Sequence, residues 1–141
     1  MPSQNKPSPT PLISVIVPLF NEEASLKWHY GAMTDFLRAS KINYELIYIN
    51  DGSSDKSLEI VQDIAKNDSR VKYISFSRNF GKEAATTAGL RACKGDAAVM
   101  IDADGQHPVE LIETFYNEWL SGQQVVIGIR ESNQGEGFIK S

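Results

Sequence analysis

The sequence predicts an α/β domain built on a mostly parallel β-sheet. Short apolar runs rich in Val, Ile and Tyr alternate with longer segments in which apolar residues recur every three or four positions. The first pattern is typical of β-strands and the second of amphipathic helices. Strands and helices that alternate in this way favour a layered domain whose strands run parallel.

Five apolar runs are predicted as strands. Several of them are apolar at nearly every position, which is typical of parallel strands that are covered on both faces. The runs are residues 12–17, 44–49, 71–76, 97–101 and 125–129.

Apolar stripes predict the helices between these strands, and we assign the stripes to the hydrophobic core. They comprise Leu26, Tyr30, Met33 and Leu37, then Leu58, Val61, Ile64 and Ala65, and finally Leu111, Phe115 and Trp119.

The helix ends also carry local signals. Asn21 is predicted to cap the first helix, and Ser53 or Ser54 the second, because these side chains accept hydrogen bonds from free backbone N–H groups. Pro108 suits the first position of a later helix, and Gly122 a position just after its end.

Composition places the chain among ordinary globular domains. It has 141 residues, of which 41% are hydrophobic and 23% charged, enough to bury a core. The formal net charge of −4, without a basic stripe, argues against a nucleic-acid partner. The single cysteine, Cys93, is expected to be a small buried helix residue, since one cysteine forms neither an internal disulfide nor a cysteine metal cluster.

The chain divides into three stretches. Residues 1–11 are predicted to be a flexible tail and not a signal peptide, and residues 12–130 form the domain. Residues 131–141 are polar and contain glycine, and we interpret them as a truncation point. No run approaches the ~20 apolar residues needed to span a bilayer, and we expect a cytoplasmic location.

Polar or glycine-containing segments follow four successive predicted strands. Ligands of open parallel sheets bind beyond the carboxyl ends of the strands, so these segments are expected to form one rim. They are residues 18–23 (PLFNEE), 50–55 (NDGSSD), 77–82 (SRNFGK) and 102–107 (DADGQH).

Asp102 and Asp104 are the predicted catalytic and metal-binding residues. In extended backbone, residues two apart project to the same side, and two carboxylates so placed repel each other unless a cation lies between them. Mg²⁺ or Mn²⁺ suits such oxygen ligands and would neutralise a departing diphosphate. An isolated Asp-x-Asp is more often a solvated turn, but the other three segments of the rim favour the metal interpretation.

Two interpretations are open for each of the other polar candidates. Asp51 could accept hydrogen bonds from a ribose or a base N–H, or it could serve the Asp-Gly turn, and both roles are compatible. Arg78 and Lys82 are equally compatible with phosphate recognition and with solvated surface charge. We expect Asp55 to support a helix start.

The two histidines are not predicted as site residues. His107 precedes a proline at a predicted helix start, which favours capping or packing over metal ligation. His29 lies within a helical pattern and is given no role.

The four rim segments resemble those of the inverting family 2 glycosyltransferases. The similarity is strongest to the polyprenyl-phosphate branch, which comprises bactoprenol glucosyltransferases and dolichol-phosphate mannose synthases. It covers about residues 12–130 and rests on VIVPLFNEE at 15–23, NDGSSD at 50–55, RNFGK at 78–82 and DADGQHP at 102–108. The resemblance implies a Rossmann-like GT-A fold and metal-dependent transfer of a hexose from a nucleotide sugar to a polyprenyl phosphate, with inversion.

The resemblance also implies a donor site. Asp51 would contact the nucleotide base, Arg78 and Lys82 would line the donor pocket, and Asp102 and Asp104 match the motif that binds metal and diphosphate. The full set of implied nucleotide-sugar-binding residues is Pro18, Asn21, Glu22, Asp51, Arg78, Lys82, Asp102, Ala103 and Asp104.

Some features depart from the family pattern. Asn50 stands where many relatives have an acidic residue, and Gly105 stands where many bactoprenol enzymes have Leu. The bactoprenol likeness favours a UDP-sugar, with a GDP-sugar as the alternative. Relatives carry their acceptor-binding half, and often membrane segments, after the fifth strand. The chain is therefore expected to supply the donor-binding half of an enzyme that works at the cytoplasmic face of the membrane.

Three other functions were weighed. A non-catalytic nucleotide-binding remnant and a glycosyltransferase with a saccharide acceptor stay as alternatives. A dinucleotide-dependent oxidoreductase is disfavoured, because PLFN at residues 18–21 replaces the Gly-x-Gly-x-x-Gly expected after the first strand.

Overall fold

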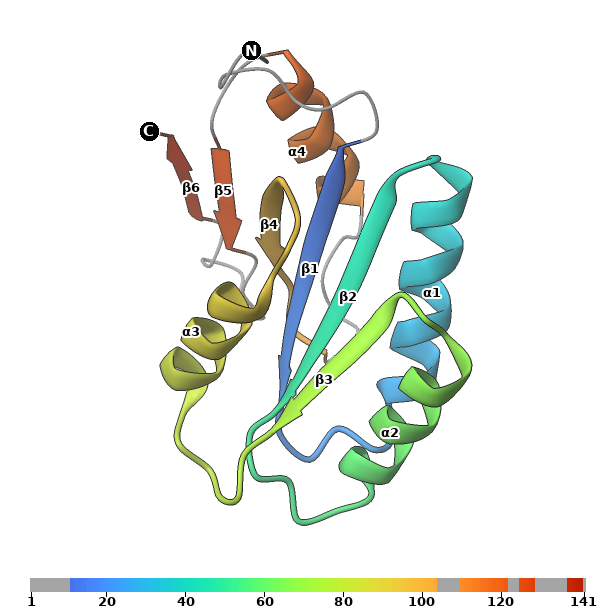
Figure 1. The fold of residues 1–141 in the computed structure, drawn as a ribbon, viewed down its shortest axis with the longest axis vertical. Coiled ribbons are helices and arrows are strands. Elements are labelled where there is room, and N and C mark those ends of the chain that lie inside the picture. Colours follow the sequence, from blue (N-terminus) through green and yellow to red (C-terminus); the bar gives the residue numbers. More distant parts are fainter. Residues whose placement is uncertain (1–10, 104–109, 122–124, 129–136, 141) are drawn as a thin grey trace.

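A computed structural model describes residues 11–103, 110–121, 125–128 and 137–140 (Figure 1). These residues form a six-stranded sheet with helices on both faces. In chain order the elements are β1 (Leu12–Leu19), α1 (Leu26–Ala39), β2 (Asn43–Asn50), α2 (Ser57–Asn67), β3 (Val71–Ser75), α3 (Lys82–Ala92), β4 (Ala97–Met100), α4 (Glu110–Leu120), β5 (Val125–Gly128) and β6 (Gly137–Lys140).

The strands are ordered β3-β2-β1-β4-β5-β6 across the sheet. The pairs from β3 to β5 are parallel, and β6 alone runs antiparallel to its neighbour β5. The predicted α/β domain with a mostly parallel sheet is therefore confirmed. Between β3 and β4 the chain crosses to the other side of β1, which makes the carboxyl ends of β1 and β4 the topological switch point.

All five predicted strands are present, and the sixth is a correction. Residues 137–140 form β6 inside the stretch interpreted from sequence as a polar end. Only Phe138 and Ile139 are apolar in this strand, and two residues are too few to give a strand pattern.

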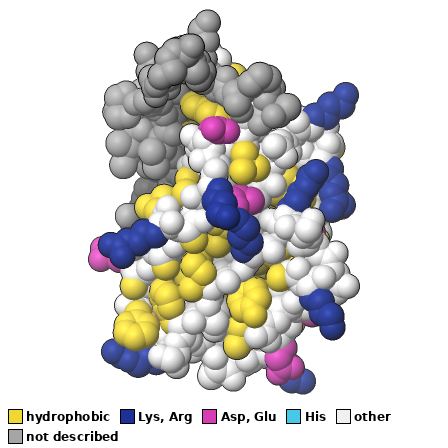
Figure 2. Space-filling model, in the orientation of Figure 1, with side chains coloured by type: hydrophobic (Ala, Val, Ile, Leu, Met, Phe, Trp, Pro, Cys, Tyr) yellow, Lys and Arg dark blue, Asp and Glu magenta, His cyan; other side chains and the backbone are white. Residues whose placement is uncertain are grey.

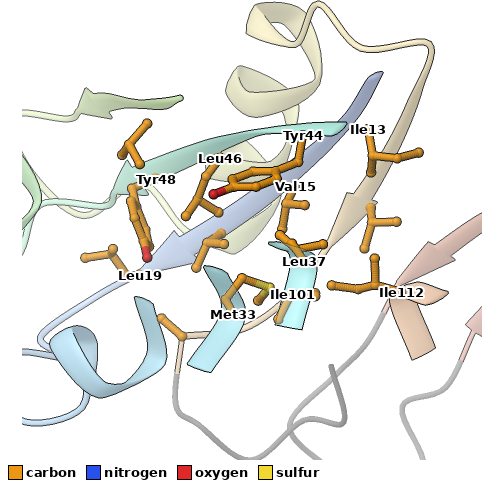
Figure 3. Close-up of a cluster of buried hydrophobic side chains, with 14 of the residues drawn as sticks. Ile13, Val15, Leu19, Met33, Leu37, Tyr44, Leu46, Tyr48, Ile101 and Ile112 are labelled. Carbon is orange, nitrogen blue, oxygen red and sulfur yellow. The ribbon is translucent and has the colours of Figure 1, made fainter. Parts of the chain in front are cut away.

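The main core lies on the face of the sheet covered by α1, α2 and α4 (Figure 3). Alternate residues of β1 and β2 point into it, including Val15 and Leu46, where they meet Met33 and Leu37 of α1. Each such fully buried side chain stabilises the fold by roughly 1.5–3 kcal/mol. The predicted helical stripes contribute most of their residues to this core, whereas Leu58 lies outside it and the side chain of Leu111 lies outside the described part of the structure.

The opposite face is covered by α3. Ile16, Ile47 and Ile49 pack there against Ala85. A Cβ on Gly89 would lie only 2.4 Å from Cγ2 of Ile16, so the small residues of α3 permit its close approach to the sheet. Figure 2 shows Lys and Arg side chains spread over this face, interspersed with hydrophobic side chains.

A buried polar cluster lies on this face near the amino ends of β1 and β2. The Glu45 carboxylate accepts hydrogen bonds from Ser14 Oγ at 2.5 Å, the Lys94 amide at 2.5 Å and Lys72 Nζ at 2.8 Å. Burial would raise the pKa of Glu45, but these hydrogen bonds together outweigh it and hold the pKa below its ordinary value.

Two predicted helix starts need correction. Helix α1 begins at Leu26, too far along the chain for Asn21 to cap it, and Asn21 bonds the next loop instead. Helix α2 begins at Ser57, and neither Ser53 nor Ser54 caps it. The expected role of Asp55 is confirmed, because its Oδ1 accepts the Ser57 amide at 2.9 Å. Pro108 and Gly122 lie outside the described residues.

Cys93 lies one residue beyond α3 and is only partly buried, so the predicted buried helix position is wrong. Its Sγ donates to the Leu90 carbonyl at 3.1 Å. In the described ranges no helix is long and apolar enough to cross a membrane.

Candidate functional site

A pocket lies at the topological switch point, beyond the carboxyl ends of β1, β2 and β4. Its walls come from three strand ends and from the first residue of α3. The lining residues are Pro18, Leu19, Phe20, Glu22, Asp51, Lys82, Asp102 and Ala103.

The structure brings six of the nine predicted donor-site residues together in this pocket: Pro18, Glu22, Asp51, Lys82, Asp102 and Ala103. The side chains of Asn21 and Arg78 are engaged elsewhere. Asp104 lies outside the described residues, as does His107.

The pocket also contains two residues that sequence reasoning did not single out. Leu19 ends β1 and is buried, whereas Phe20 follows it with 45% of its surface exposed. An aromatic residue directly after a buried strand, at the edge where ligands bind, is the signal that could have identified Phe20.

Asp51 fastens the loop before α3 to the end of β2. One carboxylate oxygen accepts the Phe80 amide at 2.7 Å, and the other accepts the Gly81 amide at 3.1 Å and Asn79 Nδ2 at 3.2 Å. A carboxylate has about four acceptor positions, so roughly one is left for a ligand. Asp51 is 5% exposed and lines the pocket, so its turn role and a ligand role are compatible.

The turn after Asp51 requires glycine. Gly52 has a φ of +72°, and a Cβ there would lie 2.2 Å from the Arg78 carbonyl carbon and 2.3 Å from the Asn79 nitrogen. The loop backbone therefore lies directly against this turn, and only glycine satisfies both the conformation and the contact.

Lys82 and Asp102 form an ion pair inside the pocket. The Lys82 Nζ lies 2.5 Å from Asp102 Oδ1, and the Asp102 side chain is only 11% exposed. Lys82 is the first residue of α3, and Asp102 follows β4 closely. The pair places a cationic and an anionic group side by side in the pocket wall.

Arg78 contacts an aromatic ring of its own loop. Its guanidinium carbon lies 4.1 Å from the centre of the Phe80 ring, which in turn contacts Phe76 edge to face at 5.6 Å. Arg78 is not among the residues that line the pocket.

Asp102 is the predicted metal ligand that lies among the described residues. The residue is 8% exposed, and its carboxylate is paired with the Lys82 ammonium group, which would have to release it before a divalent cation could bind there. Within the described ranges no three His, Cys, Asp or Glu side chains gather as metal ligands. The second predicted ligand, Asp104, lies outside those ranges.

Comparisons with known proteins identify relatives of the chain. Residues 14–141 match the family described as "Glycosyl transferase family 2". An uncharacterized glycosyltransferase of Bacillus subtilis is 44% identical over 90% of this chain and 39% of its own length. The bactoprenol glucosyl transferase of Shigella phage SfV is 38% identical over 91% of this chain and 42% of its own length. The chain thus spans about 40% of the length of these relatives.

A solved structure supports the fold. Glucosyl-3-phosphoglycerate synthase from Mycobacterium tuberculosis, in complex with Mn²⁺, UDP and phosphoglyceric acid, superposes with a TM-score of 0.64. The identity is 27%, and the match covers 88% of this chain and 45% of the synthase. The GT-A type of α/β fold expected from the sequence is confirmed by this likeness.

Proposed function

Because the chain belongs to glycosyl transferase family 2, we propose that its pocket binds the nucleotide-sugar donor of a glycosyl transfer reaction. The observation that carries this proposal is the convergence of Asp51, Lys82 and Asp102 at the switch point of the sheet. Open α/β sheets bind nucleotides at such a point, beyond the carboxyl ends of the strands.

The nucleoside is assigned to the Asp51 side of the pocket. Pro18, Leu19 and Phe20 supply an apolar wall, while Asp51 retains an acceptor position for a base N–H or a ribose hydroxyl. A UDP-sugar is favoured over a GDP-sugar, as the resemblance to bactoprenol glucosyltransferases implies, and the superposed synthase is solved with UDP.

The diphosphate is assigned to the side formed by Lys82 and Asp102. Lys82 would donate to a phosphate oxygen, and Asp102 would hold Mg²⁺ or Mn²⁺ together with Asp104. When bound, the metal ion would neutralise the negative charge of the diphosphate as it departs. Ala103 lies between the two aspartates and brings its backbone to the pocket wall.

For the whole enzyme we propose transfer of a hexose to a polyprenyl phosphate with inversion. A lipid phosphate is anionic at neutral pH, so a strong general base is less important than for a hydroxyl acceptor. The residues of this chain would then act by orienting the donor and stabilising the leaving group. Residues 12–130 are the proposed donor-binding domain.

Calorimetric titration tests the donor assignment. UDP, GDP and NAD are titrated with and without Mn²⁺ into wild type, Asp102→Asn and Asp104→Ala, with Asp63→Asn on the exposed surface of α2 as the matched control. We expect Mn²⁺-dependent UDP binding that each pocket variant weakens at least tenfold, about 1.4 kcal/mol, and that the control retains. If neither UDP nor GDP binds, or if binding ignores both Mn²⁺ and the aspartates, the proposal is wrong.

One alternative function is donor binding without sugar transfer. A chain that spans about 40% of its relatives could bind the donor without transferring the sugar. Incubation with UDP-glucose, Mn²⁺ and undecaprenyl phosphate distinguishes the two: glucosyl lipid shows that these 141 residues suffice for transfer, and binding without product shows that they supply donor binding only.

A further inference from the structure

We propose that Asn21 is a positioning residue that fastens the β1–α1 loop to the β2–α2 loop and thereby sets the shape of the pocket. It would do so without contacting the donor itself. The inference rests on the proposed function in one respect, because that function identifies UDP as the ligand of the pocket. It replaces the donor-contact role that the family resemblance implies for Asn21.

The Asn21 side chain is engaged with the neighbouring loop. Its Oδ1 accepts the Ser54 amide at 2.8 Å and the Asp55 amide at 3.2 Å, while the Asn21 amide donates to Ser53 Oγ at 2.9 Å. Its backbone is left-handed, with a φ of +53°. Asparagine tolerates this conformation better than most residues, so this position suits Asn on two counts.

Glu22 and Glu23 add further hydrogen bonds between the same two loops. The Glu22 amide donates to Ser57 Oγ at 2.9 Å, and the Glu23 amide donates to Asp55 Oδ2 at 3.1 Å. In return, Glu23 Oε1 accepts the Lys56 amide at 3.1 Å. These amide groups lie before the first residues of α1 and α2, so they have no partner within a helix. Side chains of each loop accept hydrogen bonds from the amides of the other loop instead.

The fastened segment is joined to both sides of the pocket. Phe20 and Glu22, which flank Asn21, line the pocket, and Asp51 lies just before the loop that Asn21 holds. At the other end, Ser25 Oγ donates to the Ala103 carbonyl at 3.0 Å. Asn21 therefore anchors the segment that connects the nucleoside side to the Asp102 side.

Three substitutions at Asn21 separate positioning from direct contact. Asn21→Gly keeps the left-handed backbone and removes the oxygen, Asn21→Ala removes both advantages, and Asn21→Asp keeps an acceptor oxygen. Lys41→Gly is the matched control, because Lys41 is, among the described residues, the other non-glycine residue with a positive φ, at 58°, and does not line the pocket.

Two measurements are made on each variant: backbone amide exchange of Ser54 and Asp55, and UDP affinity with Mn²⁺ at a temperature where all variants are folded. We expect Asn21→Gly to speed exchange at both amides and to weaken UDP binding about tenfold, comparable to losing one or two hydrogen bonds. Asn21→Ala should do at least as much. Asn21→Asp should retain slow exchange and most of the affinity, and Lys41→Gly should change neither.

Two results would overturn the inference. One is unchanged exchange at Ser54 and Asp55 in Asn21→Gly, which would show that Asn21 does not hold the loop. The other is an Asn21→Asp variant with slow exchange but with affinity as poor as that of Asn21→Gly, which would indicate direct contact with the ligand. If wild type binds neither UDP nor GDP, the proposed function fails, while the exchange measurement still decides the inference.

Discussion

Glu45 and Asp51 perform the same structural task at opposite ends of β2, yet of the two only Asp51 lines the pocket at the switch point. Each carboxylate accepts three hydrogen bonds, and some of the donors are backbone amides from a segment next to α3. For Glu45 the donor is the Lys94 amide after the helix, and for Asp51 the donors are the Phe80 and Gly81 amides before it. Glu45 is enclosed by its donors, of which Lys72 is one, whereas Asp51 also lines the pocket. Three hydrogen bonds therefore do not identify a carboxylate as purely structural, and access to a ligand makes the difference.

The largest effect is expected at the turn after Asp51. Gly52→Ala should lower the free energy of unfolding by about 3 kcal/mol, since it combines a left-handed backbone with a Cβ that overlaps the Arg78 backbone. Urea denaturation measures the change. Gly31→Ala is the control, because no atom lies within 4 Å of its added Cβ, and in α1 it should stabilise by about 0.5–1 kcal/mol. Equal effects at the two glycines would contradict the close approach at Gly52.

Replacing each carboxylate with its amide tests whether Glu45 serves stability alone and Asp51 also serves UDP binding. Glu45→Gln should cost about 2 kcal/mol of stability, because Lys72 loses its buried partner, and should leave UDP affinity unchanged. Asp51→Asn should weaken UDP binding at least tenfold. The Phe80 and Gly81 amides donate to different carboxylate oxygens of Asp51, and an asparagine side chain has only one oxygen that can accept a hydrogen bond. Loss of UDP affinity in Glu45→Gln, in folded protein, would argue against the contrast.

Glu45 should also make the stability of the fold depend on pH. The pKa of Glu45 is lower in the folded protein than in the unfolded chain, so its ionised form contributes stability above the unfolded value of 4.5. That contribution is lost as the pH falls below 4.5 and through the folded pKa. Urea denaturation across this range should show a fall in stability that is smaller in Glu45→Gln. An identical fall in both proteins would contradict this assignment.

The smallest effect on stability is expected at the pocket ion pair. Lys82→Met should change the free energy of unfolding by no more than about 0.5 kcal/mol, because the Lys82 side chain is 58% exposed. UDP affinity should nonetheless fall severalfold, while Lys56→Met, on the surface before α2, should leave it unchanged. A stability loss above about 2 kcal/mol would show that the pair is structural.

The sequence predicted the layers and the rim better than the individual contacts. Apolar periodicity identified five of the strands, and each of the four polar segments brings at least one described residue to the pocket at one edge of the sheet. The partners of Asn21 could not be predicted, because its hydrogen bonds join loops more than 30 residues apart in sequence. The same holds for Asp51, whose partners follow another strand, whereas Asp55 bonds two residues away and was predicted correctly.

The contact between Gly89 and Ile16 links the packing of the sheet to the chemistry of the pocket. It fixes how high α3 stands above β1, and α3 carries Lys82 at its first position. A methyl group at residue 89 would push the carboxyl-terminal half of α3 away from the sheet, while the segments before and after the helix stay fastened to Asp51 and Glu45. The helix would have to tilt between these two attachments, which would alter the reach of Lys82 toward Asp102. Substitutions on the buried side of α3 are therefore expected to change donor affinity from a distance, without touching a residue of the pocket.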